Sequence, residues 1–342
     1  MDFELSEAQT DLAAGVRRLC EGRFPLEAVR RAEGADQVVD RATWRALSDA
    51  GVFALCLPED AGGAGLGLAE AAVVFEELGR SLLAGPLVAT HLAAGLIDGA
   101  DDGSTVVGLV ERPDPPPTAP DGGSPVPVLV EHLADLDVLL VLSELGISAV
   151  DPSSLDATRL RRPMDPLTPV WSLASLPSGA PVAGPEVAKW WLRDGAVLTA
   201  ALQLGAAAWS ADLAVAYAKQ RVQFGRPIGA FQAVKHLCAD MAVRTEVARA
   251  AVHAAAVTVD QPDVGDSVVA AAGAKLLADE AALANGRSCI QVHGGMGFTW
   301  DVPAHLAYKR ARVLAGQFGT AESLADSLAE SLAESRAGEH PG

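Results

Sequence analysis

Cysteine, aromatic residues and basic charge are all scarce in this chain of 342 residues. The four cysteines lie far apart, and no CxxC pair or metal-ligand spacing joins them to the seven histidines. We therefore expect reduced structural thiols, no disulfide framework and no metal site. The formal net charge is -18 and the basic residues form no cluster, which argues against nucleic acid as a partner.

A long uninterrupted hydrophobic run is also missing. Half of the residues are hydrophobic, but charges interrupt the Ala-rich stretches, and we find no run of about 18 to 20 apolar residues that could span a bilayer. The N-terminus, Met1–Leu5, carries acidic residues where a secretory signal would carry positive ones. These absences predict a soluble protein that stays in the cytoplasm.

The first part of the chain, 1–103, is predicted to be a helical domain. Apolar residues recur there at three- and four-residue spacings, which predicts helices over 6–31, 41–50 and 68–83. A loop rich in glycine, Leu57–Gly67, separates the last two because proline and glycine break a helix.

The middle part, 104–185, is predicted to be a reduced β domain. Proline and glycine become dense in it, at Pro113–Pro117 and Asp121–Gly123. Short β-branched runs fit strands, and they lie at 126–130, 138–142 and 147–150.

The last part, 186–342, returns to long helical patterns. These cover 187–219, 230–258, 264–286 and a shorter stretch from about residue 302. Such lengths are typical of a helical bundle and exceed those of most globular helices. The whole chain is therefore predicted to be mainly α, with a small β domain between two helical domains.

The segment Arg221–Gln232, between the first two bundle helices, is longer than a bundle linker needs to be. It contains two arginines, two phenylalanines and two glutamines. A guanidinium can bind phosphate, an aromatic face can stack on a purine, and amides can hydrogen-bond. The segment is a candidate nucleotide site, and an ordinary helix–helix loop is the alternative.

A second candidate is the turn Gln291–Thr299, where glycine occupies three of four consecutive positions after a long helix. Glycines let a ligand approach the main chain closely, and consecutive amides can cradle a pyrophosphate. The alternative is a glycine C-cap, which is very common. His293 within this turn could equally be structural.

Together, the two segments closely resemble the acyl-CoA dehydrogenase family. Its members carry R-x-Q/T-F-G-x-x-I/L-x-x-F/H-Q, followed about 60 residues later by Q-x-x-G-G-x-G-F/Y, and both patterns occur here at that separation. The loop Pro58–Gly67 also matches the family pattern P-E-x-x-G-G-x-G. The resemblance implies an N-terminal helical domain, a central β domain and a C-terminal four-helix bundle that dimerises.

The resemblance also implies FAD as the cofactor and an acyl-CoA as the substrate. In the family, FAD lies across a subunit interface, and the matching segments contact the ADP half of the flavin held by the neighbouring subunit. Matching positions predict cofactor contacts from Arg221, Gln223, Phe224, Gln232, Gln291, Gly294, Gly295 and Thr320.

The catalytic base of the family has no counterpart in this sequence. In the family, a Glu removes the α-proton of the thioester from one of two alternative positions. Phe318 matches the position near the C-terminus and Gly195 the one on the first bundle helix, and neither can take a proton. Asp194 lies one place away, but it is a methylene shorter than Glu and is rotated by about 100° around the helix. It is a poor candidate base, and a surface or capping role is favoured.

The flavin platform of the family is missing as well. Members carry W-I-T/S on a strand beside the flavin ring, and Leu129-Val130-Glu131 falls at that place here. The chain therefore lacks both the base and the flavin platform that the family carries.

Three functions remain open. The first is a non-catalytic companion subunit, because some actinobacterial acyl-CoA dehydrogenases, including ones acting on steroid side chains, are α2β2 heterotetramers. The second is a self-sufficient homo-oligomeric dehydrogenase with an unconventional base, such as Asp194. The third is a flavin-free structural or binding homologue, against which the retention of both ADP-half segments argues.

Overall fold

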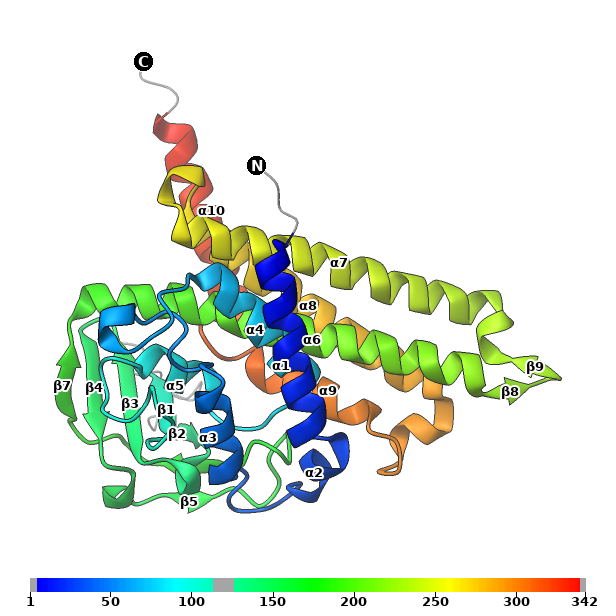
Figure 1. Ribbon diagram of the computed structural model, residues 1–342, viewed down its shortest axis with the longest axis horizontal. Helices are drawn as coiled ribbons and strands as arrows, with labels where there is room; N and C mark the ends of the chain where they lie inside the picture. Colours follow the sequence, from blue (N-terminus) through cyan, green and yellow to red (C-terminus); the bar gives the residue numbers. More distant parts are fainter. Residues whose placement is uncertain (1–4, 113–125, 339–342) are drawn as a thin grey trace. The chain divides into compact units, whose positions relative to one another are not determined.

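The computed structural model describes residues 5–112 and 126–338. The Pro/Gly-dense stretches at 113–117 and 121–123, and most of the acidic N-terminus, lie outside the described residues. By contacts, the chain divides into two compact units. Unit 1 contains the residues up to Gly22, Leu68–Leu83 and the chain from Ala196 onward, whereas unit 2 contains Arg23–Gly67 and Ala84–Gly195. Figure 1 shows the order of the elements.

Unit 1 is helical, and its long helices follow the predicted ones closely. They are α1 (Glu7–Arg23), α4 (Leu68–Arg80), α6 (Pro185–Gln220), α7 (Gln232–Asp260), α8 (Ser267–His293), α9 (Ala304–Leu314) and α10 (Ala321–Gly338), with the first residues of α6 in unit 2. The prediction of a helical bundle is confirmed. One boundary was wrong, because α8 continues to His293 instead of ending at residue 286.

The helix predicted over 6–31 is in fact two helices. α1 ends at Arg23 and α2 covers Leu26–Arg31, with Pro25 at the N-cap of α2. Proline has no N–H to donate and restricts the residue before it, so the two helical turns cannot join through this point.

Glycines bring α4 and α6 into backbone contact. A Cβ on Gly205 would lie 2.0 Å from the carbonyl oxygen of Glu76, and one on Gly79 would lie 2.2 Å from that of Leu202. Neither position can accept alanine without moving a helix, which explains why the Ala-rich α6 keeps a helix-weakening glycine at residue 205.

Two buried charge networks lie inside unit 1. In the Glu76 network, the carboxylate of Glu76 accepts a hydrogen bond from Arg249 and lies 3.4 Å from Nε2 of His253. In the Lys275 network, Nζ of the fully buried Lys275 lies 2.5 Å from Oδ2 of Asp279, and the Gln203 amide donates to Oδ1 at 2.8 Å. Both networks tie helices together through paired charges.

Unit 2 holds the strands of the predicted β domain, together with α2, α3 (Arg41–Asp49) and α5 (Leu87–Ala93). One sheet has the strand order β1-β3-β4-β7 and another has the order β2-β6-β5. The strands are β1 (Val107–Glu111), β2 (Val128–Glu131), β3 (Val138–Ser143), β4 (Gly146–Val150), β5 (Thr158–Arg159), β6 (Val170–Leu173) and β7 (Ala180–Ala183). The sequence predicted β2, β3 and β4 and missed the others.

Helix α6 is both long and apolar. By length and composition alone, α6 could cross a bilayer, which the sequence analysis did not recognise. However, 78% of its most apolar window is buried inside the protein. That burial is typical of a core helix in a soluble protein.

Candidate functional site

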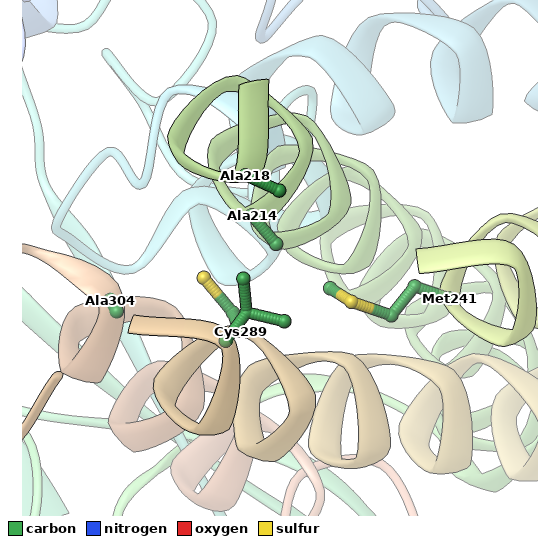
Figure 2. Packing of buried hydrophobic residues seen from close by; sticks show 6 residues of the cluster. Ala214, Ala218, Met241, Cys289 and Ala304 are labelled. Carbon is green, nitrogen blue, oxygen red and sulfur yellow. The ribbon is translucent and has the colours of Figure 1, made fainter. Parts of the chain in front are cut away.

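The ends of α6, α7 and α8 are held together by a buried apolar cluster. Figure 2 shows Ala214 and Ala218 of α6 packed with Met241 of α7 and Cys289 of α8. The same packing includes Ile228 of the first candidate segment, Val234 just after it, and Val292 of the glycine turn. The two candidate segments therefore leave the bundle at the same end, which we call the hairpin end and define as residues 221–231 and 291–300.

The first candidate segment forms a β-hairpin, where the sequence predicted only a turn. β8 (Val222–Gln223) pairs with β9 (Arg226–Pro227) around the two-residue loop Phe224-Gly225. Both loop residues have positive φ, 52° for Phe224 and 77° for Gly225. This is the pattern of a type I′ turn, in which Asn-Gly or Gly-Gly is the usual loop sequence.

Phe224 is a strained residue that gains little burial. A left-handed backbone costs a non-glycine residue about 1–2 kcal/mol, yet the side chain of Phe224 is 91% exposed. Its ring meets the Phe231 ring edge-on at 6.0 Å, and the guanidinium of Arg226 stacks 4.3 Å from the centre of the same Phe231 ring. The strain and exposure together point to a ligand or partner outside this chain. The stack of Arg226 on Phe231 supports the hairpin and was not predicted from the sequence.

The glycine turn combines packing and open backbone. A Cβ on Gly297 would lie 2.4 Å from the carbonyl oxygen of Ile290, so packing requires glycine there. Gly294 has φ of 59°, so its backbone favours glycine. Gly295 has neither constraint, since a Cβ there would meet nothing within 4 Å. Its bare backbone is therefore available to a group outside the chain.

His293 anchors this turn from inside. It is buried, its Nδ1 donates to the carbonyl oxygen of Cys289 at 2.8 Å, and its ring stacks on Tyr217 of α6 with centroids 4.1 Å apart. Sequence patterns could not indicate this stack, because the two rings are far apart along the chain. Tyr217 also lies one helical turn before Arg221, a spacing that could have indicated a shared role.

The structure brings most of the predicted cofactor residues to one exposed surface. Six of them lie in the two segments of the hairpin end, a seventh, Gln232, directly follows the first segment, and all seven are exposed: Arg221, Gln223, Phe224, Gln232, Gln291, Gly294 and Gly295. Thr320 lies apart, beyond α9, where its N–H donates to Oγ of Ser323 at 2.9 Å at the start of α10. Their contacts with a cofactor stay predictions.

The exposed groups fit the ADP part of a dinucleotide. Arg221 offers a cation for phosphate, Phe224 offers a ring face for a purine, and Gly295 offers exposed main chain that a ligand can approach, whereas the N–H of Gly294 already donates to the carbonyl oxygen of Gln291. Because the chain carries a formal net charge of -18, an anionic ligand needs such specific local contacts to offset the unfavourable overall field.

The two predicted base positions hold no acid. Gly195 is buried in α6, and Phe318 is 5% exposed with φ of 51°. Asp194 forms an ion pair in which Nε of Arg193 lies 2.7 Å from Oδ1, and its side chain is 24% exposed. This pairing fits a structural role, because a cation beside a carboxylate stabilises its charged form and weakens it as a base.

The residues that match the flavin platform of the family, Leu129-Val130-Glu131, lie in β2. Within it, Val130 is buried opposite Trp171 of β6, whereas Leu129 is 54% exposed opposite Ser172. An aliphatic side chain there offers no aromatic ring face.

The cysteines show no reactive arrangement among the described residues, and none of the four is in a disulfide there. Burial raises the pKa of Cys289 to about 12, so its sulfur stays a thiol at neutral pH. Within residues 5–112 and 126–338, no group of three or more His, Cys, Asp or Glu side chains could hold a metal ion.

Comparison with protein families gives two matches. The model described as "Acyl-CoA dehydrogenase, N-terminal domain" matches residues 6–100, and "Acyl-CoA dehydrogenase, C-terminal domain" matches residues 183–333. The matches leave out the middle of the chain, where the sequence also departs from the family pattern.

Among curated proteins, the chain is similar to acyl-CoA dehydrogenase IpdE2 of Mycolicibacterium smegmatis. The two are 36% identical over 92% of this chain and 96% of IpdE2. Acyl-CoA dehydrogenase FadE34 of Mycobacterium tuberculosis is 34% identical over 92% of this chain, but the match covers only 46% of FadE34. The chain therefore spans less than half the length of that relative.

Among solved structures, the chain is similar to the ChsE4–ChsE5 complex from Mycobacterium tuberculosis. The TM-score is 0.82 at 26% identity, covering 98% of this chain and 99% of the matched one. A variant of the Tcur3481–Tcur3483 steroid ACAD gives a TM-score of 0.82 at 28% identity, covering 97% and 99%. Both structures bear the names of two different subunits.

Proposed function

The chain belongs to the acyl-CoA dehydrogenase family, and from this premise we propose that it is the non-catalytic subunit of a heteromeric, FAD-dependent enzyme. In this proposal, its hairpin end binds the ADP half of a flavin whose ring lies in a homologous partner subunit. The partner supplies the catalytic base and acts on an acyl-CoA thioester. The three segments 1–103, 104–185 and 186–342 would then be its helical, β and bundle domains.

One observation carries this proposal: the chain keeps the ligand-facing half of an interfacial site and lacks acids at both base positions. Arg221, Phe224 and Gly295 are exposed at one end of the bundle, while Gly195 and Phe318 stand where a base would act. The loss of an acid at only one of the two base positions could reflect an unusual enzyme. The loss at both positions, combined with a strained, exposed Phe224, supports a division of labour between two subunits.

In the assembled enzyme, this chain would bind and orient the cofactor. The guanidinium of Arg221 would pair with the pyrophosphate, and the main chain at Gly295 would approach it closely. The ring of Phe224 would stack against the adenine. When bound, FAD supplies the acceptor for a hydride from the β-carbon of the thioester. This chain would take no proton in that reaction.

The relatives support a heteromer and a substrate class. ChsE4–ChsE5 is named as a complex, and the Tcur3481–Tcur3483 pair is named a steroid ACAD. FadE34 is long enough to include a second unit of this size. We extend the heteromeric assembly and the substrate class to this chain. It would be one subunit of an α2β2 enzyme that oxidises a steroid side-chain acyl-CoA or a fatty acyl-CoA. Among the described residues the four cysteines form no disulfide, which fits a cytoplasmic location.

A self-sufficient homo-oligomer is the second candidate. IpdE2 bears the name acyl-CoA dehydrogenase, and this chain spans 96% of its length. In that case an unconventional acid, such as Asp194, would have to act as the base.

Expression of the chain alone and together with a base-containing homologue from its own genome separates the two candidates. We expect the chain alone to bind little FAD and to show background activity, because loss of a positioned base costs roughly 10² to 10⁴ in rate. Co-expression should restore flavin absorbance and turnover. An isolated chain that is yellow and bleaches with an acyl-CoA would overturn the proposal, and Asp194→Asn would then test the alternative base.

A further inference from the structure

We propose that Tyr217 and His293 are positioning residues that lock the hairpin and the glycine turn into one binding geometry. This inference rests on the proposed role of the hairpin end in binding FAD. His293 is not expected to touch the ligand, because it is only 5% exposed, and Tyr217 is partly buried.

The contact between the two rings joins segments that are distant in sequence. The centroids lie 4.1 Å apart with an interplanar angle of 26°, which is a stacked pair between α6 and α8. The carbonyl oxygen of Cys289 can only accept, so the proton of the bond to His293 sits on Nδ1, and this bond of 2.8 Å fixes the ring plane. Both sides of the stack are thus held by helical backbone.

From Tyr217, a short chain of main-chain bonds leads to the hairpin. The N–H of Arg221 donates to the carbonyl oxygen of Tyr217 at 2.8 Å, and the N–H of Ile228 donates to the carbonyl oxygen of Arg221 at 2.7 Å. These bonds close the base of the hairpin on the main chain of Tyr217. The residue whose ring stacks on His293 is therefore hydrogen-bonded through its main chain to the residue that carries the guanidinium.

From His293, the path to the glycine turn is one residue long. Gly294 follows directly with φ of 59°, so the ring of His293 sets where the turn leaves α8. The backbone contact of Gly297 with Ile290 holds the far side of the same turn. The stack therefore fixes the main chain of the turn relative to Arg221.

The competing explanation is ordinary core packing, since both rings border the apolar cluster of Figure 2. The two explanations differ in how substitutions combine. If the rings only pack, their substitution lowers the stability of the fold, and its effect on FAD affinity is independent of the effect of removing Arg221. A positioning defect already misplaces Arg221, so removal of its guanidinium costs less in the variant than in the natural chain.

The test measures FAD affinity by titrating FAD into the flavin-free assembly with the base-containing partner. Tyr217→Leu and His293→Ala should each weaken binding about two- to tenfold, the range expected for loss of one aromatic pair. The double variant Tyr217→Leu/Arg221→Ala should lose less than the product of the two single losses. Tyr217→Phe, which keeps the ring, should recover the affinity lost in Tyr217→Leu.

A second readout needs no cofactor or activity. Amide hydrogen exchange in the chain alone should speed up at 222–231 in His293→Ala and at 294–299 in Tyr217→Leu, which shows that each ring restrains the opposite segment. Tyr308→Leu is the matched control, because Tyr308 is the other tyrosine and packs on α9 against Gly286. It should change neither affinity nor exchange at these segments.

The outcomes separate this inference from the proposed function. The inference is overturned if the affinity losses of the two single variants multiply in the double variant, or if amide exchange in the opposite segment is unchanged. The rings would then only pack, while Arg221→Ala would still weaken FAD binding. If Arg221→Ala leaves FAD binding unchanged, the proposed function itself is wrong and the inference is overturned with it.

Discussion

The middle of the bundle and its hairpin end differ in how their side chains are buried and paired. In the middle, charged groups are buried and paired, as in the Lys275 and Glu76 networks, and the helices approach closely enough to require glycine. At the hairpin end, Phe224 and Phe298 are 91% and 83% exposed, and Phe224 keeps a left-handed backbone.

This difference separates residues that fold the chain from residues that serve something outside it. The buried networks stabilise the fold through contacts that are complete within the chain. The exposed rings bury little of their surface within it, and a Cβ on Gly295 would meet nothing within 4 Å. Substitutions in the middle should therefore change the free energy of unfolding, whereas those at the hairpin end should change ligand binding and leave the fold intact.

The largest effect is expected in the Lys275 network. Lys275→Met leaves the buried carboxylate of Asp279, whose pKa burial already raises, without its cation. The free energy of unfolding should fall by about 3–5 kcal/mol. Lys189→Met removes the same side chain from an exposed pair with Glu186 and should cost at most about 1 kcal/mol. Chemical denaturation measures both, and equal costs would erase the contrast between buried and exposed charge.

At the hairpin end, Arg221→Ala should act on binding. Loss of a charge-assisted contact to phosphate costs about 1.5–3 kcal/mol, which is roughly ten- to 150-fold in FAD affinity. The free energy of unfolding should not change, because Arg221 is exposed. Lys219→Ala removes another exposed positive charge from the end of α6 and controls for the general field. Flavin retention after dialysis of the assembly is the measurement, and equal retention by both variants would contradict a specific contact.

Two glycines of one turn should behave in opposite ways. Gly297→Ala should destabilise the chain by about 1–3 kcal/mol, because its Cβ would lie 2.4 Å from a backbone oxygen. Gly295→Ala meets open space and should leave the melting temperature of the chain alone unchanged, yet weaken FAD binding in the assembly. If Gly295→Ala retains full affinity, no ligand approaches this backbone.

The smallest effect concerns acid stability. Burial alone would raise the pKa of Glu76, but the hydrogen bond to His253 and the charge of Arg249 outweigh it and hold the pKa below its ordinary value of 4.5. The ionised Glu76 therefore stabilises the fold above that value, and this stabilisation is lost as the pH falls through the lower, folded-state pKa. Glu76→Gln should flatten the fall in stability below about pH 4.5, whereas the exposed Glu186→Gln should follow the natural chain. A Glu76→Gln profile as steep as the natural one would show that other carboxylates cause the acid loss.

The sequence predicted the bundle and the two candidate segments because long periodic helices and clustered glycines are strong local signals. It missed β1 and β7, since a short strand containing Gly108 or Pro181 is stabilised by its neighbours in the sheet. It could not show that Phe224 is left-handed, because that conformation depends on the register of the hairpin. The burial of Lys275 and the stack of Tyr217 on His293 are likewise products of tertiary packing.

The central claim is that this chain supplies half of a shared flavin site. The most direct test is the ratio of bound FAD to protein chains, measured by flavin absorbance and native mass spectrometry on the co-expressed assembly and on the separated subunits. The account predicts one FAD for each pair of unlike chains, loss of that FAD when Arg221→Ala is introduced into this chain, and little flavin in this chain alone. One FAD per chain in the isolated protein would contradict it.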